Sequence, residues 1–504
     1  MNSEKQYIDL YRECRDQISA HSADALNAVR DAAFADFEQL GFPSRKVERY
    51  KYTNIDRLFE PNYGLNINRI EIPVDPYKAF RCDVPNLSTL LYFIVNDQFR
   101  SALQPKDNLP EGVEVTSLAQ YAKEHPEFVA EHYAKLAKTN EDGITALNTM
   151  LAQDGLMVHV KKNVVLDKTV QVINILRSDV DLMVNRRVLI VMEEGACAKF
   201  LFCDHAADDH QFLTTQVIEA YVGQNASLDL YCMEETHIKN TRVSNVYVEQ
   251  QRDSRFNHNV ITLHNGVTRN RLDVQLKGEG AECWCNGCVI ADKTQHVDNN
   301  TLIDHQVSHC TSHELYKYVL DDKSTGAFAG RVLVRHGAQK TVSEEVNQNL
   351  CATKTARMYT QPMLEIYADD VKCSHGSTVG QIVLGLKRRT KLVVHDKVER
   401  CAKIRHVATE CLVWVDRNLD AVDVQAIVGL KQRVDACIFV SLHLARREAQ
   451  LLLEFAFINE VIDKIKLEPL RDGKPSCSKS AKAASRTALS ASALWALIWS
   501  RHSR

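Results

Sequence analysis

Between residues 155 and 380 the chain repeats a pattern of short strands and turns that leaves no room for long helices. Turn residues recur at Gly195-Ala, Asn225-Ala, Asp253-Ser and Gly280-Ala, at intervals of 30, 28 and 27 residues. Periods of about 20 to 50 residues are typical of solenoids and similar arrays. Because each repeat holds two or three short apolar segments and no helix, we predict a mainly β core built as a β-solenoid. A β-sandwich is the alternative, since short strands with frequent turns also describe it.

Helical patterns precede this core. Residues 3–41 carry apolar side chains at steps of three and four, and Gly41 followed by Pro43 predicts where that helix ends. A second helix-like stretch covers 117–153, so we predict an N-terminal helical and mixed region over 1–154. A solenoid leaves open sheet edges at both ends, and helical regions are natural covers for them.

Composition describes an ordinary soluble chain of 504 residues, with 45% apolar and 25% charged residues. The formal net charge of -3 gives no electrostatic reason to expect nucleic acid or an anionic membrane as a partner. The N-terminus is polar, and no uninterrupted apolar run approaches about 18 residues, so a cytoplasmic location is expected. Fifteen scattered cysteines suit free thiols in a reducing compartment better than a disulfide framework.

The candidate chemistry lies at the end of the strand array, in the segment 364–380. Cys373 and His375 are two residues apart, so on a strand both side chains point to one face and can approach a single metal or sulfur species. Thiolate and imidazole are suitable ligands for iron and for sulfide-bridged iron. A packed cysteine beside a surface histidine is the alternative for an isolated Cys-x-His pair.

Two other groups resemble metal sites. His305, His309 and His313 are spaced by four residues, which suggests either a metal rack or an exposed or capped histidine ladder among strands. The run Cys283-x-Cys285-x-x-Cys288 resembles half of a zinc or cluster site, but no second pair at metal-site spacing follows it. Core thiols with a neighbour are the alternative there.

Several segments, in this order and at these spacings, resemble the SufB/SufD family, the scaffold proteins of SUF iron–sulfur cluster assembly. The resemblance rests on residues 41–53, 296–305, 312–321, 326–330, 339–350 and 364–380. It is closest to the SufD branch, because this chain reads His375-Gly-Ser-Thr where SufB-type chains have His-Glu-Ala-Thr.

The resemblance implies a right-handed parallel β-helix flanked by N-terminal and C-terminal helical regions. It also implies a non-catalytic subunit of a SufBCD scaffold complex, paired with a SufB-like subunit near Cys373 and His375. These two residues would then handle iron, sulfur or a transient iron–sulfur cluster, and a flavin in the complex is possible. The chain has no Gly-x-x-x-x-Gly-Lys-Ser/Thr phosphate loop, so no intrinsic nucleotide is expected and ATP hydrolysis would come from a SufC-like partner.

The segment 445–472 carries a predicted C-terminal helix over 445–465, with apolar residues at helical spacing. The resemblance implies that this helix docks the SufC-like ATPase, and packing on its own domain is the alternative. The expected docking residues are Leu452, Leu453, Phe455, Phe457 and Val461.

Two stretches depart from the family pattern, namely 381–444, rich in Val, Arg and Lys, and 473–504, heavy in Ser, Ala and Arg. One hypothesis is that both stretches were translated in an altered reading frame, and a genuine insertion is the other; 473–504 is expected to be a poorly ordered tail. Two other functions stay open: a polysaccharide-cleaving β-solenoid enzyme, and a homodimeric SufD-type protein that acts alone.

Overall fold

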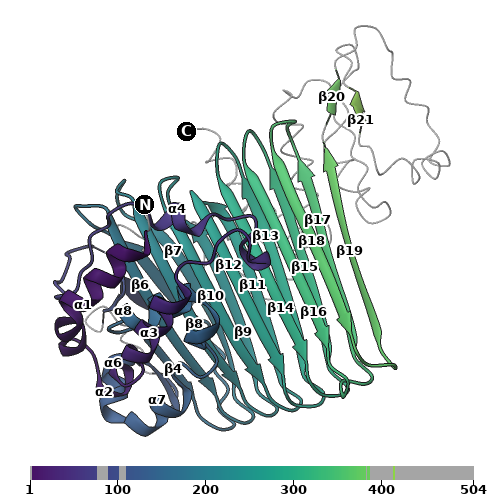
Figure 1. Cartoon of the computed structure of the whole chain (residues 1–504). Coiled ribbons are helices and arrows are strands. Elements are labelled where there is room, and N and C mark those ends of the chain that lie inside the picture. The colour runs from purple at the N-terminus through teal and green to yellow at the C-terminus, as the bar shows by residue number, and fades with distance from the viewer. Residues whose placement is uncertain (1–2, 76–88, 101–108, 382, 386–411, 415–504) are drawn as a thin grey trace, which may run out of the picture.

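The centre of the molecule is a parallel β-solenoid made of two facing sheets (Figure 1). The computed structural model describes residues 3–75, 89–100, 109–381, 383–385 and 412–414. Successive long strands alternate between the sheets, and each pairs in parallel with the strand two places along. This confirms the predicted β-solenoid and rules out the sandwich.

Both sheets run the length of the molecule. Sheet A contains β3 (Val113–Ser117), β4 (Leu156–Val160), β6 (Leu182–Met192), β8 (Phe212–Val222), β10 (Thr241–Gln250), β12 (Val267–Leu276), β14 (His296–His305), β16 (Thr325–Val334) and β18 (Arg357–Ile366). Sheet B contains β2 (Gln98–Phe99), β1 (Leu90–Val95), β5 (Val170–Leu176), β7 (Cys197–Ala206), β9 (Ser227–Glu235), β11 (Arg255–His264), β13 (Glu282–Ala291), β15 (Thr311–Leu320), β17 (Val342–Cys351) and β19 (Lys372–Gln381). Two short strands, β20 (Val383–Gly385) and β21 (Leu412–Trp414), pair with each other.

The turns explain the sequence period. The four predicted turns and the next two each hold one residue in the left-handed backbone region: Gly195, Asn225, Asp253, Gly280, His309 and Lys340. Glycine and asparagine adopt this conformation most easily. A Cβ on Gly280 would lie 2.2 Å from the side-chain oxygen of Asp253 in the stacked turn below, so only glycine fits there. The sequence period therefore results from stacked turns that share one backbone conformation.

The N-terminal helices lie on the outer face of sheet A (Figure 1). They are α1 (Glu4–Ala20), α2 (Asp24–Asn27), α3 (Arg30–Leu40), α4 (Ile55–Phe59), α6 (Leu118–Glu124), α7 (Pro126–His132) and α8 (Gly143–Leu151), with short 3-10 turns η1 (Glu48–Tyr50) and η3 (Thr139–Glu141). The pattern over 3–41 thus forms three helices instead of one, although α3 ends at Leu40 and Gly41 takes φ 59° as expected.

A buried ion pair fixes these helices to the sheet. Arg187 on β6 donates to Glu219 on β8 at 2.5 Å, and both side chains are fully buried. Glu219 also accepts hydrogen bonds from the backbone N–H groups of Ala134, Leu136 and Ala137. Because the Glu219 carboxylate is ion-paired and accepts several hydrogen bonds, these contacts offset the free-energy cost of removing its charge from water.

The segment 41–53, called the strap below, continues from the helices across sheet A to the far end of the solenoid. Arg49 forms an ion pair with Asp273 of β12. Further along the strap, Tyr52 stacks on Tyr359 of β18, with ring centroids 4.9 Å apart. This strap therefore connects the N-terminal region directly to the final coil.

The predictions for the C-terminal third fall mostly outside the described part of the chain. Only residue 381 and the strands β20 and β21 are described within 381–444. The predicted helix 445–465 and the expected docking residues Leu452, Leu453, Phe455, Phe457 and Val461 lie outside it, as does 473–504. Among the described helices, none is long and apolar enough to cross a membrane.

Candidate functional site at the end of the solenoid

Cys373 and His375 lie on β19, the last strand of sheet B. In the parallel register they stand beside Ser343 and Glu345 of β17. Ser343 and Glu345 are buried inside the solenoid, and alternate strand residues share a face, so both candidate side chains belong to the inward-facing side of the final coil. The predicted same-face arrangement follows from this strand geometry.

The two residues differ in exposure. Cys373 is partly buried and packs against a small apolar cluster that includes Val332, Val334 and Ala368. This burial raises the pKa of its thiol above the usual value. His375 is exposed because no further coil stacks on β19 within the described residues. The imidazole is thus accessible, whereas the sulfur is partly shielded and mostly protonated at neutral pH.

Two acidic side chains occupy the same register position as His375 on the two preceding strands of sheet B. Glu345 pairs with His375, and Glu314 of β15 pairs with Glu345. Both are buried, and neither carboxyl group makes a hydrogen bond of normal geometry with the described residues. Burial, with a smaller contribution from Glu314, raises the pKa of Glu345 to about 9. Burial also raises the pKa of Glu314 to about 7. Glu345 is therefore a neutral acid near pH 7.

The Glu345 side chain fits inside the coil because Gly330, which it meets on sheet A, has no side chain. A Cβ on Gly330 of β16 would lie 1.9 Å from Oε1 of Glu345, which reaches across the interior of the coil. It would also lie 2.8 Å from the ring of Phe328. Any larger residue at position 330 must displace the Glu345 side chain.

The final coil supplies too few ligands to hold a metal ion by itself. Across the described ranges, no three His, Cys, Asp or Glu side chains gather closely enough for coordination. Cys373 and His375 provide two candidate donors, and a tetrahedral iron or zinc site needs four. The remaining donors would have to come from outside the described residues.

The other metal-site candidates separate in space. His305 is buried and bonds to Ser312 at 2.9 Å, whereas His313 stacks on Trp284 outside sheet B at 4.1 Å. His309 lies in a turn with φ 61°. The three histidines therefore do not form a common metal-binding site.

The cysteine run on β13 divides between the two faces of its strand. Cys283 and Cys285 face the interior with their sulfurs 3.5 Å apart, whereas Cys288 faces outward. All three cysteines are buried, which agrees with the alternative in which two thiols pack in the core and the third lies next to them.

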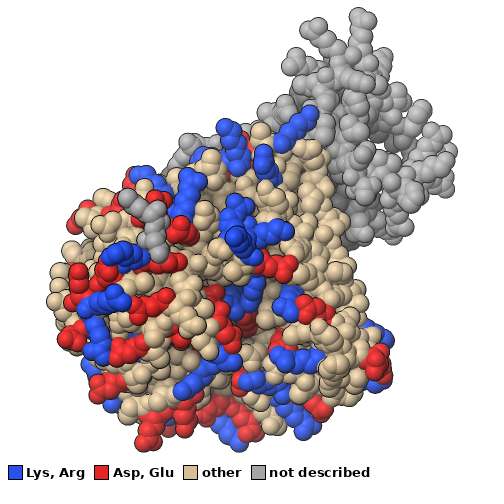
Figure 2. All heavy atoms as spheres, in the orientation of Figure 1, with Lys and Arg blue, Asp and Glu red and all other residues tan. Residues whose placement is uncertain are grey.

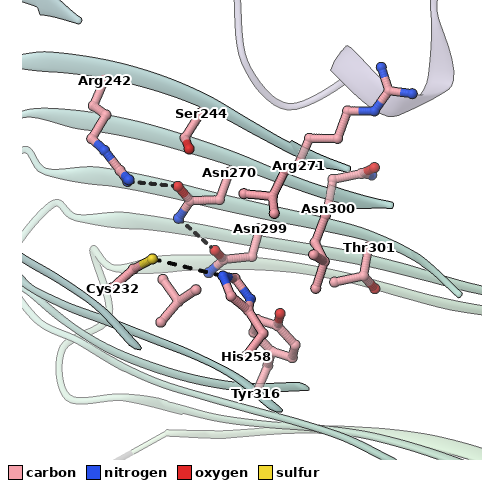
Figure 3. Close-up of a pocket in the computed structure, with 13 residues that line it drawn as sticks. Cys232, Arg242, Ser244, His258, Asn270, Arg271, Asn299, Asn300, Thr301 and Tyr316 are labelled. Atoms are coloured by element: carbon pink, nitrogen blue, oxygen red, sulfur yellow. Dashed lines mark hydrogen bonds between the residues drawn. The ribbon is translucent and has the colours of Figure 1, made fainter. Parts of the chain in front are cut away.

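A small polar cavity lies inside the middle of the solenoid (Figure 3). Its volume of about 10 Å³ is enough for roughly one water molecule. His258 and Cys232 line it with Nε2 and Sγ 3.9 Å apart. Burial lowers the pKa of His258 to about 3 and raises the pKa of Cys232 to about 12, so both are neutral. This cavity is too small for a substrate.

The end of the solenoid presents an open, largely uncharged edge. Tyr359, Ile366, Tyr367 and Val379 of the last coil are between 39% and 53% exposed. In Figure 2 acidic and basic side chains mix over the helical face, while the side nearest the last strands is mostly tan. Unpaired strand edges and exposed apolar side chains are features of a surface that pairs with another chain.

Sequence reasoning missed the acid beneath the histidine. Glu345 precedes His375 by 30 residues, and Glu314 precedes Glu345 by 31. These intervals are close to the turn period, so extending the period to the last coils would have placed all three side chains in one file.

Comparison with known proteins assigns the family. The domain described as "SufBD protein N-terminal region" matches residues 1–172, and "SUF system FeS cluster assembly, SufBD core domain" matches 174–383. Similar proteins include a Synechocystis iron–sulfur cluster assembly SufBD family protein, 25% identical over 68% of this chain and 77% of its own length. Bacillus subtilis SufD is 26% identical over 71% of this chain and 82% of its own length.

A shorter match is more similar. Escherichia coli SufD is 39% identical over 25% of this chain and 30% of its own length. The family resemblance in the sequence is confirmed by these matches. The chain belongs to the SufB/SufD family of iron–sulfur cluster assembly proteins, close to SufD.

Proposed function

We propose that this chain is a SufD-like, non-catalytic scaffold subunit that pairs with a SufB-like subunit through its final coil. The observation that carries the proposal is the open end of the solenoid, where His375 and Cys373 share one face of β19, an edge strand that pairs with β17 on one side and with no described strand on the other. Family membership supports a role within the SUF system.

The donor count supports an interface site. His375 and Cys373 offer one imidazole and one thiol to iron, sulfide or a cluster in transit, which are the cargo of the reaction. A second subunit facing the same edge would supply the missing ligands. Cargo bound in this way would be released when the two edges separate.

Co-expression tests the pairing. The tagged chain is produced with SufB-like and SufC-like proteins and purified, and its mass is measured by size-exclusion chromatography with and without the SufB-like subunit. A complex containing the SufB-like protein supports the proposal. A homodimer of this chain that persists in the presence of the SufB-like subunit would instead support a SufD-type protein acting alone.

We also propose that the predicted C-terminal helix docks a SufC-like ATPase, which would supply the nucleotide hydrolysis that this chain lacks a phosphate loop to perform. Replacing Leu452 and Leu453 with Asp is expected to abolish co-purification of the SufC-like protein, while Glu460→Gln is expected to leave it unchanged. Retained binding in the double variant would place the docking surface elsewhere.

A further inference from the structure

The polar cavity in the middle of the solenoid lies between the two sheets (Figure 3). Its lining residues come from β9, β11 and β15 of sheet B and from β10, β12 and β14 of sheet A. Each of them is at most 9% exposed, so the cavity lies well inside the molecule. Its volume of about 10 Å³ restricts the occupant to one molecule of about the size of water.

A chain of hydrogen-bonded side chains borders the cavity on the side of sheet A. Arg242 donates to Asn270 at 2.9 Å, and Asn270 donates to Asn299 at 2.9 Å (Figure 3). Asn299 donates to the hydroxyl of Tyr318 at 2.6 Å, and Tyr318 donates to the backbone carbonyl of Ala327 at 2.8 Å. Each asparagine oxygen therefore accepts one bond of this chain, and a second lone pair is left on it.

Sheet B contributes a histidine with one unused ring nitrogen. His258 of β11 is 3% exposed, and its Nε2 lies 3.9 Å from Sγ of Cys232. Its Nδ1 makes no hydrogen bond with any described residue. Burial lowers the pKa of His258 to about 3 and raises the pKa of Cys232 to about 12, so both side chains are neutral at pH 7. Nδ1 therefore calls for a neutral partner that can donate or accept a hydrogen bond.

A second unused polar atom lies on the side of sheet A. Thr301 of β14 lines the cavity and is 1% exposed, and its hydroxyl makes no hydrogen bond of normal geometry with the described residues. Apolar side chains complete the lining, namely Val246, Val260 and Leu272. Polar cavities of this size hold water, whereas apolar cavities stay dry.

We propose that this cavity is a binding site for one ordered water molecule that joins the two sheets. The water bonds to Nδ1 of His258 on sheet B and to Oγ1 of Thr301 on sheet A. An asparagine oxygen of the hydrogen-bonded chain supplies its third partner, and three bonds are typical of a buried water. The site removes the cost of leaving two buried polar atoms without partners.

Charge favours water over an ion in this cavity. Two guanidinium groups line it, and both are already ion-paired: Arg242 with Asp204 at 3.2 Å, and Arg271 with Asp273 at 2.6 Å. An ion would lose its hydration without gaining an unpaired opposite charge. Water can donate to one neighbour and accept from another, as the neutral imidazole and the hydroxyl require.

A crystal structure of the full chain tests the site directly. The expected result is density for one water in the cavity, at about 2.7–3.2 Å from Nδ1 of His258 and from Oγ1 of Thr301. A dry cavity, or a water that does not contact Nδ1, overturns the proposal.

A double-mutant cycle tests the same link in solution. His258→Leu and Thr301→Val are each expected to lower the urea midpoint, and the double variant is expected to lower it by less than the sum of the two shifts, because both single changes disrupt one water. The matched control is Thr262→Val, whose fully buried hydroxyl also makes no hydrogen bond with the described residues but does not line the cavity. Its shift is expected to add to that of His258→Leu.

Additive shifts for His258→Leu with Thr301→Val would contradict a shared water. So would equal coupling of His258→Leu to both threonine variants, since that points to general loosening of the core. If the leucine variant does not fold, the crystal structure of the unmodified chain decides.

Discussion

Glu345 and His375 occupy one register position on neighbouring strands, with the carboxyl group buried and the imidazole exposed. The last coil therefore places a candidate ligand directly above a neutral acid. A neutral acid does not compete for a cation, so it leaves the imidazole as the accessible donor at this end of the solenoid.

His375→Ala is expected to reduce cluster assembly by at least tenfold without loss of folding or of pairing with the SufB-like subunit. The imidazole is exposed and packs little, so its removal costs cargo binding and not stability. Cluster content is measured by absorbance after reconstitution of the complex. His336→Ala, at another exposed histidine, is the control. Equal activity in the two variants would remove His375 from the site.

Glu314→Gln is expected to flatten the pH dependence of stability. A carboxyl group whose pKa is raised by folding stabilises the protein fully below its unfolded pKa of about 4.3 and loses that contribution as pH rises through the folded pKa. For Glu314 and Glu345 the folded values are about 7 and about 9. Between pH 5 and pH 9 the wild type should lose about 1–3 kcal/mol more than the variant in urea denaturation. Parallel pH profiles would contradict the buried pair.

Gly330→Ala is expected to destabilise the protein by about 1–3 kcal/mol, because the new methyl group collides with Glu345 and with Phe328. Shortening the acid in Gly330→Ala/Glu345→Ala should recover part of that loss. Thermal denaturation of the two single variants and the double variant gives the coupling energy. Strict additivity would mean that the two side chains do not meet.

Tyr52→Ala is expected to loosen β18 without unfolding the N-terminal helices. The ring stacks on Tyr359, and its hydroxyl donates to Gln361 at 3.1 Å, so both contacts to the final coil are lost. Hydrogen exchange of peptides covering 357–366 should accelerate, while exchange of α3 stays unchanged. Unaltered protection of β18 would show that the strap does not stabilise the final coil.

The solenoid was predictable because its turns impose a residue type. In the first four turns the left-handed positions hold Gly, Asn or Asp at nearly constant intervals, and this leaves a period in the sequence even where the strands vary, whereas the next two turns hold His309 and Lys340. The break in the N-terminal helix near His21 was not predictable in this way, since the apolar steps of three and four continue across it.

The strand placement of Cys373 and His375 was also predictable, because a separation of two residues fixes a shared face on any strand. The role of Glu345 was not. Its raised pKa results first from burial and second from Glu314, and its side chain occupies the space beside Gly330, so the residues involved come from separate strands of both sheets. Contacts of that kind become visible only when the register between coils is known.

Pairing of the final coil with a SufB-like subunit is tested most directly by substituting two exposed valines, one at the final coil and one far from it. Val379 on β19 is 52% exposed, and Val165 near the opposite end of the solenoid is 56% exposed. A charge on an open edge strand blocks pairing with another strand. The affinity for the SufB-like subunit, measured by calorimetry, is expected to fall at least tenfold in Val379→Lys and to stay at the wild-type value in Val165→Lys. Unchanged affinity in Val379→Lys, or an equal loss in both variants, would contradict an interface at this end of the molecule.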